Sequence, residues 1–333
     1  MKTRIMMLGL GNFGISWASS ILPACADFAE LVAVVDRKKE RLEGVPEGVQ
    51  RFQDIEEALQ MIHPDLAINA TPPYAHTNTN RILLEHHVPV LCEKPIADTR
   101  EDALAAANVL AKTRGFLMIG ENYRFSPVMR AAHAFLRQGD IGKVRHVRCH
   151  FCHHHADYSM YYHGSLSHPL LEDVTIHHLD LARYLSGQEP LQVWCHEFPA
   201  AYSWYGKKPA SACIVTEMTD DVVFEYTGSL ASPESSTPWN GNWEIVCDTG
   251  ILLIRENQLS VLCGGTAQAL PIPDEDVASR VSMLREACLA LAEERKGETD
   301  FSDNLHSFLW MRDAIDASVT QQKVSCRKEG QNP

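Results

Sequence analysis

The stretch "RIMMLGLGNFG" (Arg4–Gly14) decides the fold. It begins with an apolar run typical of a buried strand and ends in the pattern G-x-G-x-x-G, before a helix-like segment. Gly9 permits a tight turn, Gly11 lets the backbone approach a pyrophosphate, and Gly14 allows close packing of helix on strand. The pattern alone is weak, because glycine-rich turns also occur in α/β proteins that bind no nucleotide.

An acidic residue strengthens the interpretation as a dinucleotide site. Asp36 ends the second apolar run, "LVAVVD" (Leu31–Asp36), about 20 residues after Gly14, where a carboxylate can hydrogen-bond the adenosine ribose hydroxyls. Because a carboxylate there would repel a 2′-phosphate, we expect NAD as the cofactor. Arg37 and Lys38 follow directly and could soften this preference, so NADP stays open.

The first 120 or so residues alternate apolar runs with helix-like segments. Continuous apolar strands separated by helices predict a parallel sheet that is covered on both faces. We therefore predict a doubly wound α/β domain over residues 1–123. Its further strands are expected at Leu66–Thr71, Val88–Cys92 and Phe116–Gly120, and its helices at Asp54–Met61, Ala75–His86 and Thr99–Lys112.

The pattern changes after "NYRFSP" (Asn122–Pro127). Several later runs alternate apolar and polar residues, which predicts a mostly antiparallel sheet with one exposed side. We therefore predict a second, α/β domain over residues 124–333, with a disordered tail from about Arg327. Its other elements are expected to be a helix at 126–138, a strand at Lys143–His153, and helices at Glu172–Gly187, 277–294 and 304–318.

Composition limits the classes of partner. The chain has 333 residues, enough for two domains, and its net charge of −13 disfavours binding to nucleic acid or to an anionic membrane. No apolar run approaches the roughly 18 residues of a membrane span, and we expect no secretory leader. The ten cysteines form no disulfide-like framework, which favours reduced thiols and a cytoplasmic location.

Two more turns follow strands of the predicted parallel sheet. They are "ATPPYAH" (Ala70–His76) and "EKP" (Glu93–Pro95), and ligands bind at this carboxyl edge of such sheets. Thr71, in a turn made rigid by two prolines, could line the nicotinamide ribose. A lone lysine such as Lys94 is usually solvated, but beside a nicotinamide its ammonium can polarise a hydroxyl or carbonyl oxygen during hydride transfer.

The predicted helix at Glu172–Ser186 carries a polar stripe. Asp173, His177, Asp180 and Tyr184 follow a helical spacing, beside an apolar stripe that can bury the helix. A carboxylate four residues from a histidine raises the basicity of the imidazole, and histidine suits proton transfer near neutral pH. A single helical histidine is more often structural, but its pairing with Asp173 favours a functional role.

The segment Cys149–His168 is rich in cysteine and histidine, a density that suggests a metal site. Its first part is predicted to be a strand, on which side chains alternate between faces, and no zinc-like spacing recurs. We therefore predict no metal. Tyr158–His168 is interpreted instead as a polar, aromatic loop that could stack on a sugar and hydrogen-bond its hydroxyls.

Taken in order, G-x-G-x-x-G, Asp36, "ATPPYAH", "EKP", "NYRFSP" and "DVTIHHLD" resemble the motifs of the glucose–fructose oxidoreductase/inositol dehydrogenase (Gfo/Idh/MocA) family. The resemblance implies a Rossmann domain followed by an α/β domain with a large open sheet. It also implies oxidation or reduction of sugars, polyols or related compounds with a pyridine nucleotide. In such proteins the EKP lysine sits between nicotinamide and substrate, and its bond to proline is often cis.

The resemblance also implies residue roles. His177 would exchange the hydroxyl proton, Asp173 would bind substrate and tune His177, and Lys94 would position the reacting oxygen. The segment "SLSHPLLEDV" departs from the glycine-rich stretch that often precedes this aspartate, which puts detailed substrate contacts in doubt. The expected cofactor contacts are Gly9, Gly11, Asn12, Phe13, Gly14, Asp36, Arg37, Thr71, Pro72, His76, Glu93 and Lys94. The expected substrate contacts are Tyr123, Arg124, Tyr158, His168, Asp173 and His177.

Two alternatives to a dehydrogenase remain. One is a redox-neutral, NAD-dependent glycoside hydrolase, and the other is a catalytically silent NAD(P)-sensing regulator. The exposed side of the second sheet, with Trp194, Phe198, Val223 and Phe224, would show apolar surface to water. We therefore expect a homodimer or homotetramer formed through that face.

Overall fold

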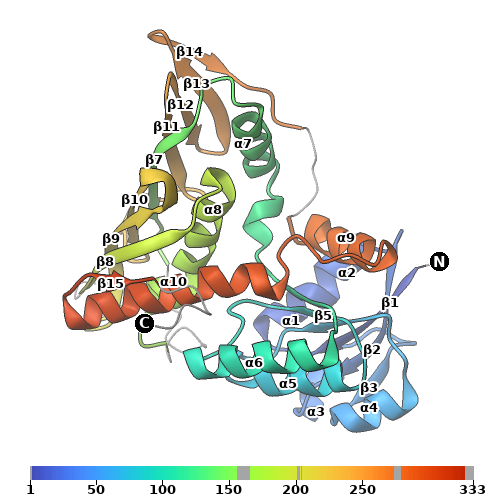
Figure 1. Ribbon diagram of the computed structural model, residues 1–333. Coiled ribbons are helices and arrows are strands. Elements are labelled where there is room, and N and C mark those ends of the chain that lie inside the picture. Colours follow the sequence, from blue (N-terminus) through green and yellow to red (C-terminus); the bar gives the residue numbers. More distant parts are fainter. Residues whose placement is uncertain (1, 156–165, 201–202, 204, 274–278, 327–333) are drawn as a thin grey trace. The chain divides into compact units, whose positions relative to one another are not determined.

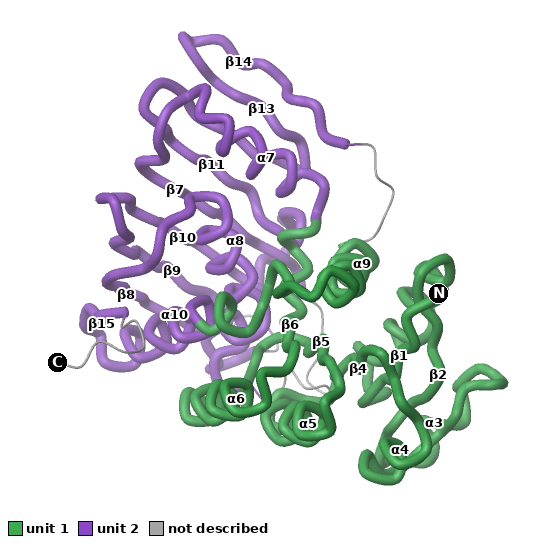
Figure 2. The backbone as a smooth tube through the Cα atoms, turned by 45° about the vertical axis from the view of Figure 1, so that its right-hand side comes forward, with its two compact units in different colours: residues 1–125, 276–305 green, residues 126–275, 306–333 purple. Residues whose placement is uncertain are grey.

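The computed structural model describes residues 2–155, 166–200, 203, 205–273 and 279–326 (Figure 1). The expected disordered tail and Tyr158 lie outside these residues. Contacts divide the chain into two compact units, shown in Figure 2: unit 1 is Met1–Phe125 with Asp276–Leu305, and unit 2 is Ser126–Glu275 with His306–Pro333. The sequence analysis instead expected two contiguous domains, 1–123 and 124–333.

Unit 1 is built on a six-stranded parallel sheet with the order β3-β2-β1-β4-β5-β6. This order is that of the Rossmann fold, in which the strand order reverses between β1 and β4 while all strands stay parallel, and ligands bind at the carboxyl ends of the strands. The doubly wound prediction is confirmed. The strands are β1 (Thr3–Leu8), β2 (Ala29–Val35), β3 (Gln50–Phe52), β4 (Leu66–Asn69), β5 (Val90–Cys92) and β6 (Leu117–Ile119).

The helices of unit 1 start where local sequence favours them. Asp54 caps α4 (Ile55–Met61) by accepting from the amides of Glu56 and Glu57, and Thr99 caps α6 (Arg100–Thr113). Helix α6 lies beside α5 (Pro73–Glu85), as Figure 1 shows. The other helical segments are α1 (Asn12–Ser16), η1 (Trp17–Ile21), α2 (Leu22–Ala24), α3 (Lys39–Leu42), η2 (Asn122–Phe125) and α9 (Ser279–Ala292).

Helix α9 belongs to unit 1 because it completes the core of that unit. Val281, Leu284 and Ala287 are buried in the same apolar cluster as Met7 of β1 and Trp17 of η1. Their spacing puts them on one face of the helix. The chain therefore leaves unit 1 near residue 125 and returns to it more than a hundred residues later.

Unit 2 contains a nine-stranded sheet with the order β14-β13-β12-β11-β7-β10-β9-β8-β15. All its pairings are antiparallel except that of β7 with β10, so the predicted mostly antiparallel sheet is confirmed. The strands are β7 (Val144–Cys152), β8 (Pro190–Pro199), β9 (Pro209–Met218), β10 (Val223–Ser229), β11 (Asn242–Cys247), β12 (Gly250–Arg255), β13 (Gln258–Cys263), β14 (Thr266–Ala269) and β15 (Val324–Ser325).

The helical segments of unit 2 pack on one face of this sheet. Phe224 is fully buried and its ring meets Trp310 of α10 edge-on, with centroids 5.4 Å apart. Helix α10 begins within unit 1 and ends within unit 2. The segments are α7 (Pro127–Gln138), η4 (Leu171–Thr175), α8 (Ile176–Ser186), η5 (Thr219–Asp221) and most of α10 (Phe301–Thr320).

The other face of the sheet carries exposed apolar side chains, but not all those expected. Trp194 and Phe198 of β8 are 37% and 39% exposed, and Val215 of β9, which pairs with Trp194, is 42% exposed. The expectation for Phe224 was wrong: it is buried, and Val223 is only partly exposed. Neighbouring residues on a strand point to opposite faces, so these two could not both face the open side.

None of the helices in the described part of the chain is both long enough and apolar enough to cross a membrane. All ten cysteines are free thiols.

Candidate functional site

The glycine-rich turn has the shape that a diphosphate requires. Gly9 adopts a φ of +85°, and a Cβ on Gly14 would lie 1.9 Å from the carbonyl oxygen of Gly9, so both positions exclude side chains. A Cβ on Gly11 would meet nothing within 4 Å. Open space over this glycine, at the start of the first helix, fits a dinucleotide diphosphate approaching the backbone.

Asp36 lies next to this turn and is almost fully buried. Its Oδ2 accepts a hydrogen bond from the amide of Leu10 at 2.7 Å, and its Oδ1 accepts one from the amide of Lys38 at 2.9 Å. Arg41 pairs with the same carboxylate at 3.3 Å. Sequence reasoning missed Arg41, which places a cation beside the group expected to bind the ribose.

The turn after β4 is ordered by buried amides. Thr71 donates its hydroxyl to Oδ1 of Asn69 at 2.6 Å, and Nδ2 of Asn69 donates to Asn80 of α5 at 2.8 Å. Asn69 and Asn80 are both buried. A polar residue at the end of an otherwise apolar strand was the available signal for Asn69, and the sequence analysis did not use it.

His76 connects two turns of the site. The ring is fully buried, with Nδ1 at 2.7 Å from the carbonyl oxygen of Pro95 and Nε2 at 2.7 Å from that of Thr71. A protonated ring would donate to both carbonyls and a neutral ring to one of them. Burial lowers the pKa of His76, against the opposing effect of the two carbonyls and Glu93. The ring has no exposed surface with which to touch a cofactor directly.

The EKP turn lies next to the glycine-rich turn. The bond between Lys94 and Pro95 is cis. Glu93 is buried and accepts a 2.7 Å hydrogen bond from the indole nitrogen of Trp17. Nζ of Lys94 lies 5.9 Å from the ring centroid of Phe13, within reach of a cation–π contact. Two of the predicted motifs are therefore neighbours within unit 1.

A second cation reaches the ring of Phe13 from far along the chain. The guanidinium of Arg280, on α9, lies 5.0 Å from the ring centroid of Phe13, and its Nε lies 3.9 Å from Oε1 of Glu93. Sequence reasoning missed Arg280, since no local motif marks it and its place depends on the return of α9 to unit 1.

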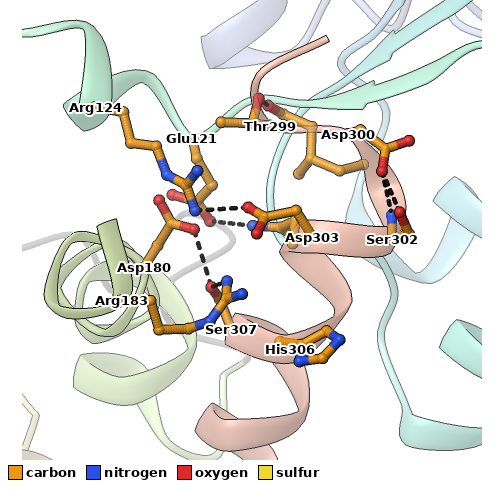
Figure 3. A network of polar contacts seen from close by, with 12 residues as sticks. Glu121, Arg124, Asp180, Arg183, Thr299, Asp300, Ser302, Asp303, His306 and Ser307 are labelled. Atoms are coloured by element: carbon orange, nitrogen blue, oxygen red, sulfur yellow. Dashed lines mark hydrogen bonds and ion pairs between the residues drawn. The ribbon is translucent and has the colours of Figure 1, made fainter. Parts of the chain in front are cut away.

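Tyr123 and Arg124 lie on the short helix η2. Arg124 is buried and pairs with Asp303 at 2.7 Å, as Figure 3 shows, and both residues belong to unit 1. Close by, Nδ2 of Asn304 donates to Glu121 at 3.3 Å. The Arg124 side chain therefore has an acidic partner within its own unit.

The helical segment that carries the proposed catalytic pair, Asp173 and His177, begins with a different geometry from the one expected. Asp173 lies in the π-helical turn η4, where the amide of Ile176 bonds to the carbonyl of Leu171, and regular α-helix begins only at Ile176. The i, i+4 rule for α-helices therefore does not by itself place Asp173 beside His177, as the sequence analysis assumed. His177 is buried.

The predicted polar stripe along this helix is not exposed. Asp180 is buried and accepts a 2.9 Å hydrogen bond from Ser307 (Figure 3). Tyr184 stacks on His133 of α7, with ring centroids 4.0 Å apart. Both residues therefore pack inside unit 2.

His168 forms an ion pair in unit 2. Its Nδ1 lies 2.7 Å from Oε2 of Glu197, and its amide donates to Glu172 at 3.0 Å. The hydrogen bond with Glu197 raises the pKa of His168 despite burial. The described residues contain no group of three His, Cys, Asp or Glu side chains that could hold a metal ion, and residues 156–165 of the suspected segment lie outside them.

Two family models match consecutive parts of the chain. Residues 3–121 match "Oxidoreductase family, NAD-binding Rossmann fold" and residues 129–253 match "GFO/IDH/MocA C-terminal domain". The chain belongs to the Gfo/Idh/MocA family. The predicted family, the oxidoreductase class and the NAD-binding fold are thereby confirmed.

Individual relatives agree with this family. The chain is 26% identical to the uncharacterized protein y4oX of Sinorhizobium fredii over 78% of this chain and 75% of that protein. It is 31% identical to an inositol 2-dehydrogenase of Rhizobium meliloti over 58% of each chain, less than two thirds of that enzyme's length. An oxidoreductase from Agrobacterium radiobacter, solved with NAD⁺, L-tartaric acid and magnesium, shares the fold with a TM-score of 0.87 and 21% identity over 98% of this chain and 99% of that one.

Proposed function

We propose that the protein is an NAD-dependent dehydrogenase that oxidises a secondary hydroxyl of a sugar, a polyol such as an inositol, or a related polyhydroxy compound. The observation that carries the proposal is the position of Lys94, whose ammonium lies 5.9 Å from the Phe13 ring of the glycine-rich turn. A lysine at the dinucleotide turn is well suited to polarise a substrate oxygen. Inositol 2-dehydrogenase activity in a relative supports the substrate class.

Each residue has a defined task in this proposal. The nicotinamide, when bound, supplies the acceptor for the hydride that leaves the hydroxyl-bearing carbon. His177 takes the proton from the hydroxyl as the carbon–oxygen double bond forms, and in the reverse direction returns it. Lys94 donates a hydrogen bond to the same oxygen and stabilises the negative charge that develops on it. Asp173 binds a neighbouring substrate hydroxyl.

The residues of unit 1 that would hold the cofactor are those that surround the open glycine. Gly11 leaves room for the diphosphate, Asp36 accepts from the adenosine ribose, and the turn at Thr71 lines the nicotinamide ribose. A carboxylate has about four acceptor sites, more than the amides of Leu10 and Lys38 and the guanidinium of Arg41 occupy, so Asp36 retains the capacity to bind a ribose. The remaining predicted contacts, among them Asn12, Arg37 and Pro72 for the cofactor and Tyr123 and His168 for the substrate, stay predictions.

The experiment is an absorbance assay for NADH formation at pH 8 to 9 with NAD⁺ and a panel of inositols, sugars and sugar acids. Wild type is compared with Lys94→Ala and His177→Ala, while NAD⁺ binding is titrated in parallel. We expect turnover with at least one substrate and a loss of roughly 100-fold or more in kcat in both variants, with NAD⁺ still bound. A matched control is His86→Ala, since His86 is exposed just after the end of α5.

Other outcomes would favour the alternatives. Cleavage of a glycoside without net NADH formation would identify the redox-neutral hydrolase. If the protein binds NAD⁺ but turns over no compound, and both variants bind NAD⁺ as the wild type does, the dehydrogenase is contradicted and a sensing regulator is favoured.

A further inference from the structure

We propose that Arg280 binds the diphosphate of the dinucleotide. It would complete the cofactor site from the later of the two chain segments that form unit 1, Asp276–Leu305. This inference rests on the NAD-binding part of the proposed function, but not on dehydrogenase activity. No sequence motif marks the residue.

The position of Arg280 is the first argument. Its guanidinium lies 5.0 Å from the ring centroid of Phe13, a residue of the turn whose Gly11 faces open space. The ring of Phe13 is 39% exposed, so the cation lies over a surface that a ligand can reach. Both residues belong to unit 1.

The unused hydrogen-bonding capacity of Arg280 is the second argument. Its contact with Glu93, at 3.9 Å, is longer than a hydrogen bond, and Oε1 of that carboxylate already accepts from Trp17. The five N–H donors of Arg280 form no hydrogen bond with any other described residue, although its side chain is only 22% exposed. A partly buried guanidinium with free donors is suited to a ligand that brings several acceptor oxygens.

The chemistry of that ligand follows from the surroundings. Phosphate oxygens match the planar fork of a guanidinium, and the glycine-rich turn places a diphosphate close by. The carboxylate of Glu93 would repel the diphosphate, but the positive charge of Arg280 lies beside that carboxylate and weakens the repulsion. The diphosphate therefore gains a charged partner that the backbone of the turn cannot provide.

A purely structural role is the competing explanation, and the same helix offers the control for it. Arg285 also lies on α9, over the ring of Phe28 at 4.1 Å, and pairs with Asp27 at 3.0 Å. It therefore makes the same two kinds of contact as Arg280, but away from the glycine-rich turn. If packing against an aromatic ring were all that mattered, Arg280→Gln and Arg285→Gln would have similar effects.

The experiment measures the Kd of NAD⁺ and of ADP-ribose by isothermal titration calorimetry for the wild-type protein, Arg280→Gln and Arg285→Gln, at two salt concentrations. ADP-ribose keeps the diphosphate and lacks the nicotinamide. We expect Arg280→Gln to raise the Kd of both ligands by the same factor, about tenfold or more, and Arg285→Gln to leave both unchanged. The salt dependence of binding should also be weaker in Arg280→Gln, because a screened charge pair has been removed.

Several results would overturn the proposal. A loss of affinity for NAD⁺ alone would show that Arg280 contacts the nicotinamide instead. Equal losses of affinity in Arg280→Gln and Arg285→Gln would indicate a structural effect. The same conclusion would follow if Arg280→Gln unfolded at a temperature low enough to explain its weaker binding. Unchanged affinity in Arg280→Gln, or failure of the wild-type protein to bind ADP-ribose, would also refute it, whereas NAD⁺ binding without dehydrogenase activity would refute only the proposed function.

Discussion

His76 shows how much one buried side chain can control at the residue scale. Its ring links the carbonyl of Thr71 to that of Pro95, so it fixes the turn after β4 relative to the turn that carries Lys94. Replacement by Leu leaves a buried carbonyl without a donor, which costs about 1–3 kcal/mol. We expect His76→Leu to lower the free energy of unfolding in urea by that amount and to reduce kcat more than NAD⁺ affinity.

The control for this prediction lies just after the same helix. His86→Leu alters an exposed histidine whose contacts with Glu56 and with the carbonyl of Ile82 lie at the surface, and it should change the free energy of unfolding by no more than about 0.5 kcal/mol. His76→Gln keeps a donor and should recover part of the loss. Equal stability of His76→Leu and wild type would show that the two carbonyls do not depend on the ring.

His168 predicts a pH dependence of stability. Because the hydrogen bond with Glu197 raises its folded-state pKa above the ordinary 6.5, its contribution is full below that pH and is lost as pH rises through the folded pKa. The difference in unfolding free energy between wild type and His168→Gln should therefore be largest below pH 6.5, at about 1 kcal/mol, and shrink as the pH rises through the folded-state pKa. A difference that grows with pH would contradict the prediction, and the control is His150→Gln, at an exposed site on β7 in the same unit.

Residues in local motifs were predictable from the sequence, and residues brought in by the fold were not. Gly9, Gly11 and Asp36 follow a spacing set by one strand–turn–helix unit, so their proximity needs no knowledge of the rest of the chain. Arg280 is part of the same site only because α9 packs on that unit. Arg41 was within reach of sequence reasoning, since it follows Asp36 by only five residues, but many surface arginines lie that close to an acidic residue.

At the scale of the first strand–turn–helix element, substitutions of Gly11 and Gly14 distinguish an effect on NAD⁺ affinity from an effect on the free energy of unfolding. Gly11→Ala adds a methyl to open space at a φ of −69°, so we expect it to change the free energy of unfolding by less than about 1 kcal/mol. The same methyl occupies the place of the diphosphate, so NAD⁺ affinity should fall by roughly tenfold or more.

Gly14→Ala should behave differently. Its Cβ would collide with the carbonyl of Gly9 at 1.9 Å, so the helix must move away from the strand and the protein is destabilised by several kcal/mol. Thermal unfolding and NAD⁺ titration of the two variants check both statements. Strong destabilisation by Gly11→Ala, or normal NAD⁺ binding in that variant, would refute the assignment of the open space to the cofactor.

The helix that carries the proposed catalytic pair, Asp173 and His177, marks a limit of element prediction. The sequence from Glu172 to Ser186 correctly indicated a helix, but its first turn is π-helical. A π turn adds one residue to the hydrogen-bonded ring, and no residue type specifies that insertion. Element type could therefore be predicted, whereas the orientation of Asp173 could not.

At the scale of the whole molecule, the exposed side of the large sheet predicts association. Trp194, His196 and Phe198 point the same way along β8, and Val215 lies opposite Trp194. An apolar patch of this kind is a feature of subunit interfaces. We propose a homodimer or homotetramer through it, and expect Trp194→Glu to lower the molar mass measured by light scattering after size-exclusion chromatography.

Leu289→Glu is the matched control, because Leu289 is also an exposed apolar residue but lies on α9. It should leave the molar mass unchanged. A wild-type protein that is already monomeric at micromolar concentration, or a Trp194→Glu variant that keeps the wild-type mass, would contradict the proposal.

The fold class of both units could be predicted because apolar periodicity reports on each element separately. The way the chain divides between the units could not. The spacing of Val281, Leu284 and Ala287 predicts a helix with one apolar face, but nothing in it says which sheet that face covers. The answer depends on a fit between surfaces, which a single sequence does not display.

The return of α9 to unit 1 has a consequence for protein synthesis. A ribosome adds about 5–20 residues per second. On the order of ten seconds or more therefore pass between synthesis of the first sheet and synthesis of α9, the helix that completes the core of unit 1. The core of unit 2 is also completed late, because Phe308 and Trp310 of α10 belong to its interior. The two cores are completed almost together, once α9 and α10 have emerged, and until then each unit exposes an apolar face that chaperones can bind.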